Sequence, residues 1–129
     1  MLERIEIKAG VDTPHVVLDP ESLSCEISGK SYPPDVLKFY EPIMDWLDDY
    51  RYLNKEKLDI AFKLDYYNTA SSKILLEMFY KLEEVTKDGT KVLIKWYYPD
   101  DDEEMLEVGE EFQRLVNIPF EHISYVKKY

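Results

Sequence analysis

The segment over residues 66–73, YYNTASSK, places one threonine and two serines where the hydrophobic pattern changes its period. From residue 57 to 66 apolar residues alternate with polar ones, which is typical of a strand, and from residue 70 to 85 they recur every three to four residues, which is typical of a helix. The change predicts that Thr69 lies at the N-cap or the first position of a helix, exposed to solvent, after a strand that ends near Tyr67.

A hydroxyl at this junction has two interpretations. Thr69 is either a plain helix cap, whose oxygen accepts a backbone N–H, or a phosphoacceptor. A helix N-terminus tolerates a phosphate because its first N–H groups and the positive end of its dipole face the anion. Phosphorylation would add about −1.5 to −2 charges at pH 7. We expect the surrounding surface to bind partner proteins, with Ser71 and Ser72 facing outward; its expected residues are Tyr67, Asn68, Ser71, Ser72, Lys73 and Tyr97.

Pairs of tyrosines mark the ends of two predicted strands. Tyr66 and Tyr67 end one of them, and Tyr97 and Tyr98 end the next. Adjacent parallel strands put their carboxyl ends on one edge of a sheet, where functional crevices form. The alternative is that these tyrosines only finish the strands, each with a buried ring and a solvated hydroxyl.

Signatures of catalysis and of metal binding are mostly missing from the sequence. The chain has four glycines and neither a GxGxxG motif nor a phosphate-binding loop. His15 and His122 lack a partner at metal-ligand spacing, and a single cysteine, Cys25, excludes an internal disulfide. Composition alone leaves a Ser/His/Asp triad open, but no serine lies in a glycine-flanked strand-turn-helix elbow. We expect no enzymatic activity, no cofactor and no metal.

The acidic run over residues 100–104, DDDEE, could be read as a cation site. Asp100, Asp102 and Glu104 alternate as in an EF-hand, but the glycine and the distal glutamate of that loop are missing. The favoured interpretation is the first turn of a helix, where acids complement the helix dipole. A partner-facing acidic patch is compatible with it.

The hydrophobic pattern predicts a single domain over residues 1–129, an α/β fold with a mixed sheet of five to six strands and about three helices. An N-terminal antiparallel hairpin precedes two β-α-β crossovers, which imply a partly parallel sheet covered by helices. Pro42 is expected to kink the first helix. The expected strands span residues 3–8, 16–18, 23–28, 57–66, 92–96 and 120–126, and the helices span 34–50, 70–85 and 100–116, with Leu115 buried in the last and a loop over 29–31.

The net charge of −11, from 16 basic and 27 acidic residues, argues against binding to nucleic acid or to anionic membranes. Residues 100–114 hold eight of the acids and one base, Arg114. No apolar run approaches the roughly 20 residues that a membrane-spanning helix needs. Residues 1–7 lack a signal-peptide core, so we expect the protein in the cytoplasm.

The order of strand, hydroxyl-bearing junction and helix resembles the STAS-type anti-sigma-factor antagonists of bacteria, in which a partner kinase phosphorylates a serine or threonine at this junction. The chain is more closely similar to the SiaC family of bacterial regulatory phosphoproteins. The resemblance spans nearly the whole chain. The matching stretches are ISGKSYP (27–33), FYEPI (39–43) with Trp46 and Leu47, YNTASSK (67–73), KWYY (95–98) followed by acids, and Thr13 with Pro14.

The resemblance implies a STAS-like fold and a non-enzymatic, partner-switching function. Thr69 matches the threonine that a dedicated kinase phosphorylates and from which a PP2C-type phosphatase removes the phosphate. The unphosphorylated form is then expected to bind and activate a diguanylate cyclase, which raises cyclic-di-GMP and favours biofilm formation. The alternatives are a switch of the anti-sigma-factor-antagonist kind with another client, or a small enzyme that uses the strand-end crevice.

Overall fold

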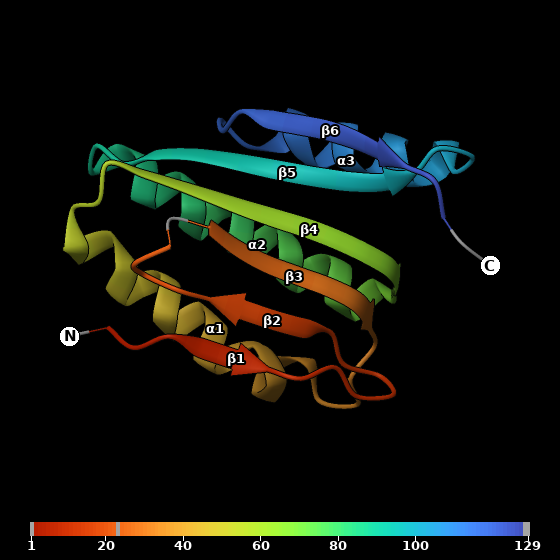
Figure 1. The fold of residues 1–129 in the computed structure, drawn as a ribbon, viewed down its shortest axis with the longest axis horizontal. Coiled ribbons are helices and arrows are strands. Elements are labelled where there is room, and N and C mark those ends of the chain that lie inside the picture. Colours follow the sequence, from red (N-terminus) through yellow and green to blue (C-terminus); the bar gives the residue numbers. More distant parts are fainter. Residues whose placement is uncertain (1, 23, 128–129) are drawn as a thin grey trace.

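The computed structural model describes residues 2–22 and 24–127, and it shows a six-stranded sheet with three helices on one of its faces (Figure 1). The strands are β1 (Ile5–Ile7), β2 (His15–Leu18), β3 (Ser24–Ser31), β4 (Lys57–Tyr67), β5 (Lys91–Pro99) and β6 (Phe120–Tyr125). The helices are α1 (Val36–Tyr50), α2 (Thr69–Lys87) and α3 (Glu103–Leu115), with a short 3-10 turn η1 (Arg51–Leu53) after α1.

The six strands lie side by side in chain order. β1, β2 and β3 pair antiparallel, as the predicted N-terminal hairpin requires, whereas β3, β4, β5 and β6 pair parallel. The parallel part therefore contains three β-α-β crossovers, one more than the sequence analysis expected. Right-handed crossovers that all advance in the same direction put their helices on the same face, so the other face of the sheet stays open (Figure 1).

Aromatic side chains fill the layer between the sheet and the helices. Phe62 of β4 contacts Phe79 of α2 with ring centroids 5.1 Å apart, and Trp96 of β5 contacts Phe112 of α3 at 5.6 Å. The rings of Phe62, Phe79 and Trp96 are almost completely buried. Each buried aromatic of this kind contributes roughly 1.5–3 kcal/mol through apolar area removed from water. The predicted mixed α/β fold class is confirmed.

Two strands run further than their sequences predict. β3 continues through Ser31, although residues 29–31 were expected to form a loop, and β5 continues through Pro99. Each extension pairs with a parallel neighbour, β3 with β4 as far as Tyr67 and β5 with β6 as far as Tyr125, so ladder hydrogen bonds outweigh the local glycine and proline signals. Leu23, expected in the third strand, lies outside the described residues.

The helices begin at side-chain caps. Asp35 caps α1 by accepting the Lys38 amide at 3.1 Å, and α1 continues through Pro42. Asp102 caps α3 by accepting the Met105 amide at 2.9 Å, so α3 starts later than residue 100. Leu115, expected to be buried, is 48% exposed. Among the described helices, none combines the length and the apolar character needed to cross a membrane.

Candidate functional site

The junction between β4 and α2 has the geometry that the change of period predicted. β4 ends at Tyr67, Asn68 has an extended backbone (φ −93°, ψ 176°), and Thr69 is the first residue of α2. The Asn68 side-chain oxygen accepts the Ser71 amide at 2.9 Å, so Asn68 is the N-cap. Thr69 is the first residue of the helix and is exposed, so both its predicted position and its predicted exposure are confirmed. Its hydroxyl is therefore not required for capping.

Ser71 faces the interior, so the expectation that it faces outward with Ser72 is wrong. Its hydroxyl accepts a 2.8 Å hydrogen bond from the Ser31 hydroxyl, which lies 2.7 Å from the hydroxyl of Tyr40. All three residues are fully buried. The Asn68 amide also donates to the Ser31 carbonyl oxygen at 3.1 Å. These bonds connect the first turn of α2 to the end of β3 and to α1. They form because buried polar groups need hydrogen-bond partners where water is excluded.

Ser31 and Tyr40 also belong to this site, although their sequence positions did not predict it. Burial raises the pKa of the Tyr40 hydroxyl, and its hydrogen bond with Ser31 partly offsets that shift. The sequence offers two weak signals. Ser31 lies just after a predicted strand, and Tyr40 occupies an apolar position of the next predicted helix. Nothing in the local pattern shows that residues 31, 40 and 71 meet, because their contact depends on the parallel pairing of β3 with β4.

An irregularity in β4 turns Tyr67 toward the helices. Leu64 lies opposite Gly29 and Tyr66 lies opposite Lys30, so Asp65 is an extra residue on β4. An extra residue reverses the side-chain alternation that follows it. Tyr66, 52% exposed, packs edge-on against Tyr32, whereas Tyr67 is half-buried. Burial, and then the nearby Asp102 carboxylate, raise the pKa of the Tyr67 hydroxyl.

Tyr67 lines a groove of about 310 Å³ between α2 and α3, which we call the α2–α3 groove. Ser72 and Lys73 also line it, and they follow Thr69 by three and four residues, which places all three on one face of α2. The structure thus brings Tyr67, Ser72 and Lys73 together in the groove, and Thr69 lies one turn earlier on the same face of α2. The groove is lined by Tyr67, Ser72, Lys73, Leu76, Val108, Glu111, Phe112 and Leu115.

Tyr97 is not part of this surface. Its neighbour Trp96 is buried against the helices, so the alternation of β5 puts Tyr97 on the open face of the sheet. There the Lys63 ammonium lies 6.0 Å from the ring centre of Tyr97 and 4.5 Å from that of Tyr125. The strand ends meet at one edge of the sheet as expected, but Tyr67 and Tyr97 point to opposite faces.

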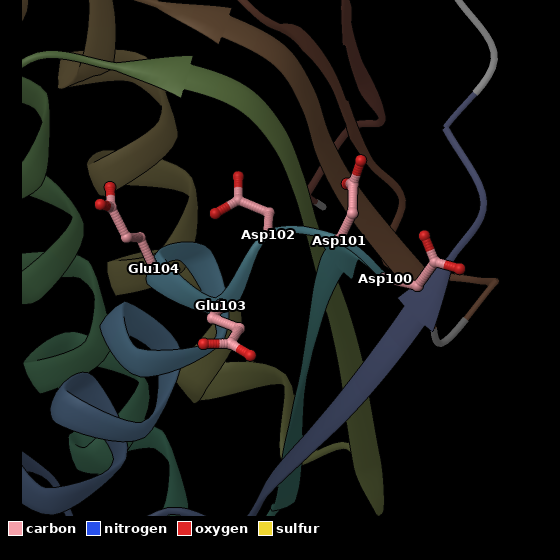
Figure 2. Close-up of a pocket in the computed structure, with 5 residues that line it drawn as sticks. All are labelled: Asp100, Asp101, Asp102, Glu103 and Glu104. Carbon is pink, nitrogen blue, oxygen red and sulfur yellow. The ribbon is translucent and has the colours of Figure 1, made fainter.

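The acidic run does not form a chelating cluster in the described part of the chain. Figure 2 shows that the side chains of residues 100–104 point in different directions. No group of three or more histidine, cysteine or acidic side chains among the described residues is arranged to hold a metal ion. Asp102 caps α3, and Glu103 and Glu104 occupy its first turn. This arrangement supports the helix-dipole interpretation.

The histidines and the cysteine lie apart from the Thr69 surface. His15 of β2 lies 3.2 Å from a Glu6 carboxylate oxygen, and His122 of β6 lies 2.8 Å from the Gln113 side-chain oxygen. β2 and β6 are separated by three strands. Burial raises the pKa of the Cys25 thiol to about 11, so this thiol stays protonated at neutral pH. These groups do not form a nucleophile–base pair with one another.

Comparison with known proteins finds similar chains in Pseudomonas aeruginosa. An uncharacterized protein of Pseudomonas aeruginosa strain UCBPP-PA14 is 27% identical over 116 residues, which cover 90% of this chain and 92% of that protein. The crystal structure of apo-SiaC from Pseudomonas aeruginosa superimposes with a TM-score of 0.85 at 26% identity and covers 94% of this chain and 98% of its own.

A second solved structure shows a relative with its partner. It is the crystal structure of the diguanylate cyclase SiaD in complex with its activator SiaC from Pseudomonas aeruginosa, and the matched chain has a TM-score of 0.88 at 26% identity, covering 94% of this chain and 99% of that one. The family model for SiaC family regulatory phosphoproteins matches residues 7–125. The fold, the hydroxyl-bearing junction and this match together show that the chain belongs to the SiaC family of regulatory phosphoproteins.

Proposed function

We propose that this protein is a non-enzymatic phospho-switch whose modified residue is Thr69. The observation that carries the proposal is the exposed position of Thr69 at the start of α2, with the cap supplied by Asn68. A kinase can reach this hydroxyl without unfolding the chain. A phosphate there lies at the positive end of the α2 dipole, where an anion is stabilised.

The proposed partners are a protein kinase, a PP2C-type phosphatase and a diguanylate cyclase. The family consists of regulatory phosphoproteins, and the related SiaC of Pseudomonas aeruginosa is the activator of the cyclase SiaD. The unphosphorylated chain binds and activates a cyclase of its own cell, in the cytoplasm, which raises cyclic-di-GMP and favours biofilm formation. A phosphate on Thr69 weakens this binding because a doubly charged group desolvates poorly in a close interface.

Intact-mass analysis and phosphopeptide mapping of the protein isolated from its own cells test the modification. We expect one fraction heavier by one phosphate, with the phosphate on Thr69, and loss of that fraction in the Thr69→Ala variant. Ser72→Ala is the matched control, because Ser72 lies on the same helix face and should leave the phosphorylated fraction unchanged. A phosphate that maps to Ser72, or its absence under all growth conditions, would contradict the proposal.

A further inference from the structure

We propose that the outer edge of β6 binds an extended, basic segment of a partner protein, which adds to the sheet as a further strand. β6 lies at the border of the sheet with α3 behind it (Figure 1). β5 separates it from β4, the strand that leads into Thr69. The edge is therefore a second interaction surface, and it goes beyond the phospho-switch proposed above.

The backbone of β6 presents a row of hydrogen-bonding groups to solvent. On its inner side, the Pro119 carbonyl oxygen accepts the Ile94 amide of β5 at 3.1 Å. Successive residues of a strand direct their backbone groups to opposite sides, so the N–H and C=O groups of Phe120, His122 and Ser124 point away from the sheet. In the part of the chain that the structure describes, no strand pairs with this edge. Such an edge can pair with a strand of another chain.

The two edges of the sheet differ in length and in composition. β1 pairs with β2 over only three residues, and Lys8 follows it. Short edge strands and lysines hinder the addition of further strands. β6, all of whose residues the structure describes, spans six residues without a proline, a lysine or a shift of register. Of the two edges, β6 is the one that can accept another strand.

Acidic side chains lie on both faces of the sheet beside β6. Glu121 is exposed on the open face, because its neighbour His122 faces the helices. On the helical face, the Gln113 side-chain oxygen of α3 lies 2.8 Å from the His122 ring. Glu110 precedes Gln113 by three residues on the same side of α3 and is exposed. A strand added to β6 would therefore have a carboxylate on each face.

The end of β6 is acidic as well. The Asp100 amide donates to the Tyr125 carbonyl oxygen at 2.8 Å, which places Asp100 beside the end of the strand (Figure 2). Asp101 and Asp102 follow directly, and Lys127 offsets one of these charges. Charge complementarity therefore requires lysine or arginine on the added strand.

The same charges argue against a second copy of this chain as the occupant. Two copies joined through β6 would bring their α3 helices towards each other. α3 carries five glutamates and one arginine, and that arginine, Arg114, is paired with Glu111 at 2.6 Å. Like charges brought together across an interface weaken association. A basic segment of another protein meets the same surface without this repulsion.

The side chains of β6 indicate what lies between the basic residues of the partner. An added strand would place one set of its side chains beside Ile123 and Tyr125 and the other set beside Phe120 and His122. All four of these side chains are half-buried. Cross-strand pairs of aromatic and β-branched residues stabilise a sheet. The best partner segment therefore alternates lysine or arginine with residues such as valine.

Titration with a capped peptide of alternating lysine and valine tests the chemistry of the partner. The matched control is the glutamate–valine peptide of the same length. We expect the lysine peptide to bind and the glutamate peptide not to bind, and we expect binding to weaken as salt is added. A lysine peptide that is methylated at every backbone nitrogen keeps its charge, loses its strand donors and should not bind. Equal binding of any two of these three peptides at a measurable affinity, or no binding of the lysine peptide, would overturn the proposal.

Amide hydrogen exchange tests the geometry. In the free protein the amides of Glu121 and Ile123 belong to the ladder with β5 and should exchange slowly, whereas those of Phe120, His122 and Ser124 should exchange rapidly. The bound lysine peptide should slow the latter three by about tenfold or more. Unchanged exchange at these three amides would overturn strand addition. Slow exchange in the free protein, together with a dimer in analytical ultracentrifugation, would assign the edge to a second copy and overturn the proposal.

Charge reversals test the location on the protein. Glu110→Lys/Glu121→Lys changes the acids on the two faces beside β6, and Glu41→Lys/Asp45→Lys makes the same change on the exposed face of α1. We expect the first pair to weaken binding of the lysine peptide by about tenfold or more. The α1 pair should stay within about twofold of the unmodified chain. Equal losses from both pairs would overturn the proposal.

The Thr69→Glu variant separates this surface from the phospho-switch. It should bind the lysine peptide within about twofold of the unmodified chain, because β5 lies between β6 and the strand that leads into Thr69. Loss of peptide binding in this variant would overturn the claim of a separate surface. Failure to find a phosphate on Thr69 would overturn the proposed function and leave the peptide results at β6 unaffected.

Discussion

Asn68 and Thr69 divide two tasks that one hydroxyl residue could have combined. Asn68 accepts the Ser71 amide and caps α2, which leaves the Thr69 hydroxyl exposed at the first helical position. If Thr69 were the cap, a phosphate on its oxygen would remove a hydrogen-bond acceptor that the helix uses. Because the cap is elsewhere, the modification can change the surface charge and leave the helix start in place.

Replacing the cap should lower stability, whereas replacing the acceptor hydroxyl should not. Asn68→Ala should reduce the free energy of unfolding by about 1 kcal/mol, the usual effect of losing a side-chain cap, and Asn68→Asp should retain most of it. Thr69→Ala is the control and should change stability by less than about 0.5 kcal/mol. Urea denaturation measures all three. An equal loss for Asn68→Ala and Thr69→Ala would assign the capping role to Thr69 instead.

The buried hydroxyl chain of Ser31, Tyr40 and Ser71 should contribute measurably to stability. Ser71→Ala removes the acceptor of the Ser31 hydroxyl in a site closed to water, so we expect a loss of about 1–3 kcal/mol. Ser72→Ala, one position further along α2 and half-buried, should cost less than about 0.5 kcal/mol. Similar denaturation midpoints for the two variants would show that this chain of hydroxyls contributes little.

At the scale of elements, the close approach of α3 to β5 sets one wall of the α2–α3 groove. Gly109 faces the Trp96 ring, and a Cβ at this position would clash with the indole. The indole N–H donates to the Met105 carbonyl oxygen at 2.9 Å, one turn earlier in α3. The ring is buried and held by this bond, so it cannot move aside at little cost.

Gly109→Ala should therefore destabilise the protein although alanine favours helix. The helix preference gains about 0.5–1 kcal/mol, and overpacking against a buried ring costs about 1–3 kcal/mol. We expect a net loss in thermal denaturation and a change in tryptophan fluorescence. Glu110→Ala, the exposed neighbour on α3, is the control and should leave both signals almost unchanged. A more stable Gly109→Ala protein would contradict the close packing described for α3.

Hydrophobic periodicity predicted the order of the strands and helices, because alternation and helical spacing record which side chains face the core. It did not predict where β3 and β5 end, because residues 29–31 and Pro99 carry turn signals that pairing with a neighbour outweighs. Nor could it predict the extra residue at Asp65, which depends on the register between β3 and β4. That register sends Tyr67 into the groove, whereas Tyr97 follows the regular alternation of β5 to the open face.

At the scale of the whole molecule, phosphorylation adds charge to an already acidic protein. The net charge is −11, and a phosphate on Thr69 would add about −1.5 to −2 more at pH 7. The added charge lies at the positive end of α2, which offsets part of the repulsion. We therefore expect the switch to act through the surface that the protein presents and not through unfolding.

Thr69→Glu should confirm that the folded state tolerates an anion at this position. We expect its free energy of unfolding to differ from that of the unmodified chain by no more than about 1–2 kcal/mol, the scale of charge effects at helix ends. Chemical denaturation with far-UV circular dichroism makes the comparison, and Thr69→Gln controls for side-chain size. A Thr69→Glu protein that melts far below both would mean that the switch works by unfolding.

The site was predictable only in part, and for a physical reason. The position and exposure of Thr69 follow from local sequence, since a change of period locates a helix start. The inward direction of Ser71 does not, because it depends on a buried partner 40 residues away, Ser31. The α2–α3 groove could not be predicted either, because one of its walls belongs to α3. Leu115 of α3 is exposed, although its helical spacing predicted a buried position.

The central claim is that the phosphorylation state of Thr69 decides whether the client binds. The measurement is calorimetric titration of the purified cyclase with the unmodified chain, the Thr69-phosphorylated chain, Thr69→Ala and Thr69→Glu. We predict nearly equal affinities for the unmodified chain and Thr69→Ala, and affinities weaker by about 2 kcal/mol or more for the phosphorylated chain and Thr69→Glu, since each places an unpaired charge in a close interface. Equal affinities for all four would contradict the account and leave Thr69 as a surface residue without a regulatory role.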